Sequence, residues 1–185
     1  ETAGKGFDQI LKSICKEVKG PISAEVTAEN FENMLSEAKI LSKISKNIVI
    51  KLPLTFNGLK ACKHLTKKNY KTNVTLCFTV PQAILAAKAG ATYISPFIGR
   101  LDDIGQNGVN LIRDIKKVFS NYTNFKTKIL AASVRSIEHV TEVAKAGADI
   151  STIPPKIFHQ LYKHELTDKG LKIFLEDWEK SKQKI

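Results

Sequence analysis

Segments typical of β-strands and of helices alternate strictly along this chain of 185 residues. Each of six apolar segments is followed by one whose hydrophobic residues recur at helical spacing, and no two strand segments are consecutive. The strand segments span residues 21–26, 47–55, 71–78, 91–97, 126–134 and 148–155, and the helical ones 7–18, 27–45, 57–69, 80–90, 107–122, 137–147, 156–164 and 166–184. Because parallel strands need crossover helices, this alternation predicts βαβ units and a parallel sheet.

The fragment AKAGA occurs twice, at residues 87–91 and 144–148, each time between a helix and a strand. Gly90 and Gly147 fit the position just after a helix, where a left-handed backbone is favoured. The repeat therefore predicts one helix-to-strand joint used twice. No Pro/Gly/Ser-rich linker divides the chain, so we expect one domain over residues 1–185 with a C-terminal helix at about 167–185.

Two architectures fit the alternation, a doubly wound open sheet and a (β/α)8 TIM barrel. An open sheet would usually carry a Gly-rich phosphate turn after an early strand, and none is present here. Polar residues instead lie near the ends of many strands, where barrels build their active sites. These residues are Glu25, Lys51, Asn73, Thr75, Ser95, Ser133 and Arg135. We therefore expect the barrel, although six strands are too few for eight.

Composition favours a soluble globular protein, since 43% of the residues are hydrophobic and 25% charged. The apolar runs are much shorter than the roughly 20 residues of a membrane span, and the N-terminus has no apolar signal core. Cys15, Cys62 and Cys77 form no CxxC pair, so we expect reduced thiols and a cytoplasmic location.

The formal net charge of +11 could attract nucleic acid. However, the lysines are spread over every predicted helix, which indicates a solvated surface and suits an anionic metabolite as substrate. The histidines have no ligand spacing, so we expect no metal site. They are His64, His139, His159 and His164.

Lys51 lies near the end of the apolar segment NIVIKLPLT, where a charged amine is costly unless it is paired or reaches water. In a barrel it would point into the mouth, and an apolar lining would favour a neutral amine that can attack a carbonyl. The alternative is a structural lysine that reaches solvent or pairs with Glu25 of the neighbouring strand. Glu25 could correspondingly be an acid/base group or only a counter-ion.

Other polar residues could complete a site. Asn73 and Thr75 are two apart on one strand and so share a face, which suggests either a polar cavity or a hydrogen-bonded pair. Arg100 follows a strand end and could bind phosphate or pair with Asp102 or Asp103. Ser133 and Arg135 are also two apart, and with Arg100 they could hold one phosphate group.

Several motifs together resemble the small transaldolases, within the group that includes the fructose-6-phosphate aldolases. They are IVIKLPLT followed by FNGLKA, TNVTLCF, SPFIGRLDD, LAASVR, the AGAD…TIPP joint and FLEDW, in the same order. The resemblance implies a TIM barrel of class I aldolase type, with Lys51 forming a Schiff base to a ketose phosphate and no cofactor. It also implies that Glu25, Asn73 and Thr75 act in proton transfer and water positioning, that Ser95 and Phe97 line the site, and that Arg100, Ser133 and Arg135 hold the phosphate.

The sequence departs from the family at its N-terminus. Family members begin with a first barrel strand bearing an aspartate, followed by a TTNPS-like segment, and this chain starts after both. We therefore expect an upstream strand carrying that aspartate, because a barrel needs its first strand to close.

The resemblance implies a transaldolase of the pentose phosphate pathway that moves a dihydroxyacetone unit from sedoheptulose 7-phosphate or fructose 6-phosphate to an aldose phosphate. The alternative within the group is an aldolase that releases free dihydroxyacetone, but such aldolases resemble this chain less, with Tyr in place of Phe97 and Gln in place of Glu25. A remote alternative is a basic nucleic-acid-binding protein. Such a protein would need a clustered basic face with exposed aromatic side chains, whereas the phenylalanines here lie mostly at core-type positions. The resemblance further implies a homo-oligomer, a pentamer or a decamer.

Overall fold

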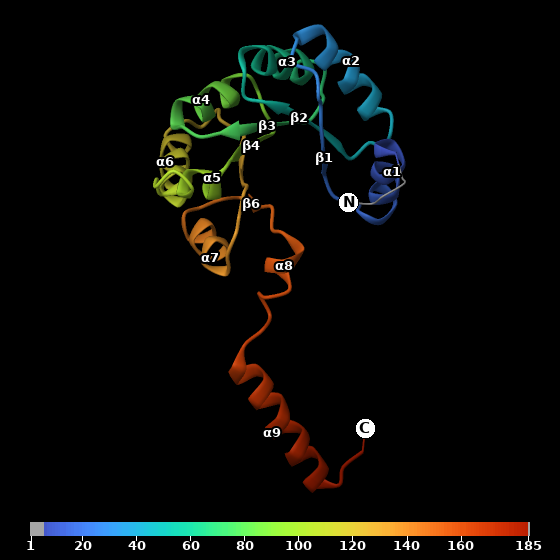
Figure 1. Ribbon diagram of the computed structural model, residues 1–185, viewed down its shortest axis with the longest axis vertical. Helices are drawn as coiled ribbons and strands as arrows, with labels where there is room; N and C mark the ends of the chain where they lie inside the picture. The colour runs from blue at the N-terminus through green and yellow to red at the C-terminus, as the bar shows by residue number, and fades with distance from the viewer. Residues whose placement is uncertain (1–5, 185) are drawn as a thin grey trace.

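A parallel sheet curls into part of a barrel in the computed structural model, which describes residues 6–184 (Figure 1). The strands neighbour one another in chain order, and every neighbouring pair is parallel. They are β1 Ile22–Glu25, β2 Ile48–Pro53, β3 Thr72–Cys77, β4 Tyr93–Pro96, β5 Lys128–Ala131 and β6 Ile150–Ser151. The fold class predicted from the alternation of strands and helices is confirmed, with six strands in a curled half-barrel.

The helices between strands lie on the outer side of the curl, while within residues 6–184 one further helix precedes β1 and two follow β6 (Figure 1). They are α1 Phe7–Glu17, α2 Phe31–Ser42, α3 Phe56–Thr66, α4 Val80–Lys88, α5 Ile98–Asp102, α6 Gly108–Ser120, α7 Ile137–Lys145, α8 Pro155–Phe158 and α9 Glu165–Ser181. Side-chain caps start most of the crossover helices, as at Asn30, where Oδ1 accepts from the Asn33 amide at 2.9 Å. The short helix α5 was not expected, because the sequence IGRLD has no amphipathic period long enough to detect.

The C-terminal helix differs from its expected range of about 167–185. Helix α9 begins at Glu165, where the imidazole of His164 accepts the Leu166 amide, and it ends at Ser181 before Lys182 adopts a positive φ of 55°. Residue 185 lies outside the described residues. None of the residues of α9 is buried, and the helix extends away from the sheet (Figure 1).

The repeated AKAGA fragment forms the same joint twice, as predicted. Gly90 and Gly147 have φ angles of 88° and 90°. The amides of Ala91 and Ala148 each bond to the carbonyl five residues earlier, at 3.1 and 3.0 Å. This pattern is the Schellman motif, in which a left-handed residue ends the helix and turns the chain toward the next strand.

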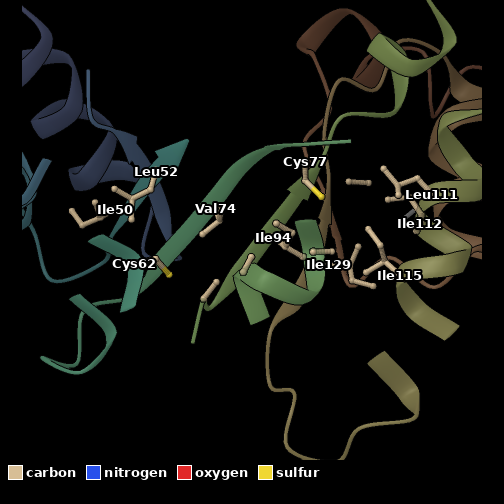
Figure 2. Packing of buried hydrophobic residues seen from close by; sticks show 14 of the residues in the cluster. Ile50, Leu52, Cys62, Val74, Cys77, Ile94, Leu111, Ile112, Ile115 and Ile129 are labelled. Carbon is tan, nitrogen blue, oxygen red and sulfur yellow. The ribbon is translucent and has the colours of Figure 1, made fainter. Parts of the chain in front are cut away.

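The main core lies between the sheet and the outer helices. Figure 2 shows Ile50, Val74 and Ile94 of the strands in this layer, together with Ile112 and Ile115 of α6. All five are completely buried. Burying each isoleucine contributes about 2 kcal/mol, so the apolar faces of the helices stabilise the curl more than helix propensity does.

A second, smaller cluster lies on the inner face of the curl. It consists of Val49, Tyr93 and Leu130, from β2, β4 and β5. Successive side chains of a strand point to opposite faces, so Val49 shares the inner face with Lys51. This cluster therefore forms an apolar layer on the inner face, directly before the polar residues at the carboxyl ends of the strands.

No helix among residues 6–184 combines the length and the apolar character that crossing a lipid bilayer requires.

Candidate active site

A cavity of about 420 Å³ opens at the carboxyl ends of the strands. Its polar lining comes from the four strands β1 to β4 and from the segments after β5 and β6, and α1 contributes four apolar residues. The polar lining residues are Ser23, Glu25, Lys51, Asn73, Ser95, Ser133 and Thr152, and the residues from α1 are Phe7, Ile10, Leu11 and Ile14. The structure thus brings six of the nine predicted site residues together around one space, whereas Thr75, Arg100 and Arg135 do not line it. The six are Glu25, Lys51, Asn73, Ser95, Phe97 and Ser133.

Lys51 stands in the centre of this polar layer. The side chain is 25% exposed, and Nζ donates to Oε2 of Glu25 at 2.9 Å. The two residues occupy matching positions in the pairing of β1 with β2. The ion pair with Glu25 was one of the two alternatives for Lys51, and the structure shows it, while also placing the amine at the wall of the cavity.

Three side chains form a hydrogen-bonded row across the strands beside Lys51. Ser95 Oγ donates to Asn73 Oδ1 at 2.8 Å, and Asn73 Nδ2 donates to Ser23 Oγ at 3.1 Å. Asn73 therefore has both ends of its amide bound, which holds its orientation. Sequence reasoning missed Ser23, although its position two residues before Glu25 places it on the same strand face.

Thr75 lies two residues beyond Asn73 and is completely buried. Within residues 6–184 its Oγ1 finds no hydrogen-bond partner. The pairing of β3 with β4 shifts register between Val74 and Cys77, and Leu76 within this bulge has a φ of 62°. Bulges change the direction of side chains and are common beside active sites. A buried hydroxyl without a partner at such a bulge is therefore a candidate functional group.

The predicted phosphate-binding residues lie around α5 and the loop after β5. Arg135 binds Asp103 with both terminal nitrogens, Nη1 to Oδ1 and Nη2 to Oδ2, the latter at 2.7 Å. This hydrogen-bonded pair lowers the pKa of Asp103 and raises that of Arg135, in each case chiefly through the side-chain hydrogen bonds. Both groups are exposed, so solvent screens the attraction between them.

Arg100 does not make the ion pair that the sequence suggested as an alternative. Its guanidinium instead lies 5.0 Å from the ring centroid of Phe97, and among the described residues Asp102 and Asp103 pair with His139 and Arg135. The reason is tertiary: the loop after β5 and the start of α7 bring Arg135 and His139 to these two carboxylates. Phe97 also packs edge-on against Phe78, with ring centroids 6.0 Å apart.

Ser133 lines the cavity but does not continue β5. Its φ of 60° breaks the strand geometry, so the two-residue alternation expected for Ser133 and Arg135 does not apply. The Ser133 carbonyl accepts the amide of Gly99 at 3.2 Å, and a Cβ at position 99 would collide with that carbonyl. A glycine in α5 thus lets this loop approach the helix.

Helix α1 supplies an apolar wall that sequence reasoning did not assign to the site. Phe7 and Ile14 are 60% and 42% exposed, whereas Leu11 is buried. The signal was present as a helical stripe of hydrophobic residues, but nothing local showed that the stripe would face a polar cavity.

A curled sheet of parallel strands, with a lysine, a carboxylate, an amide and hydroxyls gathered at the carboxyl ends of the strands, defines a (β/α)-barrel enzyme site. Known proteins agree with this class. The family model described as Transaldolase/Fructose-6-phosphate aldolase matches residues 5–185. The chain belongs to this family, and is an enzyme of the transaldolase family.

Curated relatives support the same assignment. The chain is 57% identical over 183 residues to a protein of Bartonella tribocorum named "Probable transaldolase", and 58% identical to one of the same name from Rhizobium meliloti. Each alignment covers 99% of this chain and 84% of the relative. A third protein of that name, from Brucella ovis, is 56% identical with the same coverage.

A solved structure supports the fold alone. Inosine 5′-monophosphate dehydrogenase from Legionella pneumophila superposes with a TM-score of 0.59 at 17% sequence identity. The match covers 82% of this chain and about half of that structure's chain, 49%.

Proposed function

We propose that the protein is a transaldolase, which transfers a dihydroxyacetone unit from sedoheptulose 7-phosphate or fructose 6-phosphate to an aldose phosphate through a Schiff base on Lys51. The observation that carries the proposal is the placement of the Lys51 amine at the cavity wall, 2.9 Å from the Glu25 carboxylate. The name shared by the relatives supports the same activity.

The pair of Lys51 and Glu25 supports the first step. A lysine amine must give up a proton before it can attack a carbonyl, and the carboxylate at hydrogen-bond distance can accept that proton. The neutral amine adds to C2 of the ketose to form a carbinolamine. Protonation of its hydroxyl, by Glu25 directly or through water, releases water and leaves a cationic imine.

The cationic imine then acts as an electron sink. Glu25, a carboxylate again after the preceding step, accepts the C4 hydroxyl proton directly or through water. The C3–C4 bond breaks, its electrons flow into the imine, and an aldose phosphate leaves while an enamine stays on Lys51. The enamine attacks the aldehyde carbon of the acceptor, whose oxygen takes a proton. Hydrolysis of the new imine by one water regenerates Lys51 and frees the product ketose.

Water and hydroxyl groups need fixed partners during these steps. We assign that role to Asn73, Ser95 and Thr75. Asn73 and Ser95 are already hydrogen-bonded to each other, while the buried Oγ1 of Thr75 has no partner in the described part of the chain and can bond a water during the reaction.

The phosphate of the substrate is assigned to Arg100, Ser133 and Arg135. The Arg100 guanidinium lies over Phe97, and Arg135 is two residues from Ser133; Phe97 and Ser133 line the cavity. Two guanidinium groups beside such residues suit a phosphate, because their hydrogen bonds are charge-assisted and can be bidentate. Two of the Arg135 nitrogens already bind Asp103, which holds the planar group in place while its other donors stay available.

Transfer is favoured over release of free dihydroxyacetone by Phe97. Its phenyl ring lines the cavity and has no hydroxyl to hold the water that would hydrolyse the intermediate early. The fructose-6-phosphate aldolase reaction is the second candidate, and the family description covers both activities.

Trapping with borohydride tests the proposal. The protein is incubated with fructose 6-phosphate, reduced and digested, and the adduct is located by mass spectrometry. We expect the added mass on Lys51, because reduction converts the imine to a stable amine. Lys60 and Lys63 on the following helix are internal controls, and an adduct on either of them would contradict the assignment.

We also propose a cytoplasmic enzyme of the pentose phosphate pathway that assembles as a homo-oligomer, a pentamer or a decamer. Burial raises the pKa of the Cys62 thiol to about 11 and that of Cys77 to about 12, which suits a compartment where thiols stay reduced. Helix α9 supports assembly, because Leu171, Phe174 and Trp178 are 57%, 73% and 42% exposed. No nucleic acid or membrane partner and no cofactor is part of the proposal.

A further inference from the structure

Through its two ring nitrogens His139 contacts the loop that carries Arg135 and the helix that carries Arg100, two residues of the predicted phosphate site. Nδ1 accepts the backbone amide of Arg135 at 3.3 Å, and Nε2 lies 3.1 Å from Oδ2 of Asp102. The side chain is only 22% exposed. In the sequence His139 was one of four scattered histidines with no assigned role.

These contacts determine which ring nitrogen of His139 carries the proton. Since Nδ1 accepts a hydrogen bond from Arg135, it carries no proton, and Nε2 must be the donor to Asp102. The other oxygen of Asp102 accepts the amide of Gly108 at 3.0 Å. Asp102 is therefore held at the junction of α5 and α6 and gives His139 a fixed anchor.

A second contact runs parallel to this one. Asp103, next to Asp102, binds the side chain of Arg135. Two consecutive carboxylates at the end of α5 thus hold the segment from Arg135 to His139 at two points. Around His139 the charged groups are Asp102 on α5, Arg135 in the loop and Glu138 on its own helix, with Asp103 and Arg100 completing the charges beside Arg135.

The loop needs such support. Ser133 has a φ of 60°, which a residue other than glycine adopts only when its surroundings impose it. Only Val134 stands between Ser133 and the Arg135 amide that His139 binds. The Ser133 carbonyl accepts the Gly99 amide, so the two contacts together restrain both ends of Ser133–Arg135.

We infer that His139 is a positioning residue for the phosphate subsite. It ties the Ser133–Arg135 loop to α5, so that Arg135 and Ser133 meet the same phosphate as Arg100 of that helix. The inference rests on the proposed function only in taking the ligand to be a sugar phosphate. The contacts of His139 would support the binding of any anion of similar shape and charge.

A purely structural role is the alternative. His139 is the third residue of α7, and a side chain at that position commonly reaches back to cap the helix. However, Ser136 already caps α7, its Oγ accepting the His139 amide at 3.1 Å. The contact with Asp102 on another helix adds nothing to capping, and it is the contact that a positioning role requires.

Three variants separate the two contacts. His139→Asn keeps an acceptor near Nδ1, His139→Gln keeps a donor near Nε2, and His139→Ala keeps neither. Sulfate, which stays doubly charged at neutral pH, is the probe, with its affinity measured by calorimetry on the full chain. Thermal unfolding of each variant reports stability separately.

We expect His139→Ala to weaken sulfate binding about tenfold, because one loop hydrogen bond and one anchor are lost together. The Asn and Gln variants should lie between Ala and the wild type. With fructose 6-phosphate, KM should rise by a similar factor while kcat changes less. In the wild type, imidazole 15N shifts should show the Nε2–H tautomer.

Two failures are distinguishable. If the wild type binds sulfate and all three variants bind it equally well, His139 is only a structural residue and the inference is wrong. If the wild type itself does not bind sulfate, the phosphate subsite of the proposed function fails, and with it this inference. If His139→Ala does not fold, the Asn and Gln variants decide by the same comparison.

Discussion

Replacing Thr75 with valine should stabilise the protein while slowing the proposed reaction. Thr75 is completely buried on β3, and among the residues that the structure describes its Oγ1 has no hydrogen-bond partner. Valine keeps the branched shape and replaces the hydroxyl by a methyl group. The change therefore removes a buried polar atom without leaving another one unpaired.

The magnitude follows from that environment. Leaving a buried hydroxyl unpaired costs about 1 to 3 kcal/mol, so we expect the free energy of unfolding to rise by about 1 kcal/mol after some loss of fit. For a domain of this length, 1 kcal/mol corresponds to about 2 to 4 °C in Tm. If the same hydroxyl positions water during the reaction, turnover should fall by about 100-fold.

Thr72→Val on the same strand is the matched control. Thr72 is also completely buried, but its Oγ1 lies 3.3 Å from Cys62 Sγ. Removing that hydrogen bond should lower stability by about 1 kcal/mol and leave the site intact, since Thr72 packs on the helix side. Denaturant unfolding and a coupled transfer assay measure both variants. If Thr75→Val loses as much stability as Thr72→Val, the hydroxyl is satisfied in solution and the reasoning is wrong.

Three further predictions follow. Arg135→Ala should raise KM for phosphorylated sugars more than about tenfold, whereas an equal loss with unphosphorylated analogues would indicate a structural role. The same change should raise the pKa of Asp103, followed by NMR, because Arg135 lowers it. The pair stabilises the fold above the ordinary pKa of Asp103, and this stabilisation is lost as pH falls through the lowered pKa. Arg135→Ala should therefore reduce the change of unfolding free energy with pH over that range. Phe97→Tyr should increase the release of free dihydroxyacetone without an acceptor. An unchanged ratio of release to transfer would show that Phe97 does not decide between the two activities. Phe174→Glu on α9 should shift the mass measured by light scattering toward the monomer, and an unaltered oligomer would place the interface elsewhere.

The sequence alone was sufficient for the fold class and for placing Lys51 beside Glu25 at the strand ends. Alternation of strand and helix patterns depends on local spacing, which is why the six strands and the joints at Gly90 and Gly147 were predicted correctly. Lys51 was identifiable because a charged residue in an apolar strand is a local contradiction. Its position relative to Glu25 followed once neighbouring parallel strands were assumed.

Only the tertiary structure decided the contacts between segments distant in sequence. Spacing along a strand says which face a residue occupies, but not which partner it meets across the sheet, so Ser23 beside Asn73 and the apolar wall of α1 were missed. Arg135, rather than Arg100, reaches Asp103 because the backbone turns at Ser133, and no local pattern announces that turn. The two contacts of His139 depend on the same turn, since they exist only where a loop and a short helix are packed together.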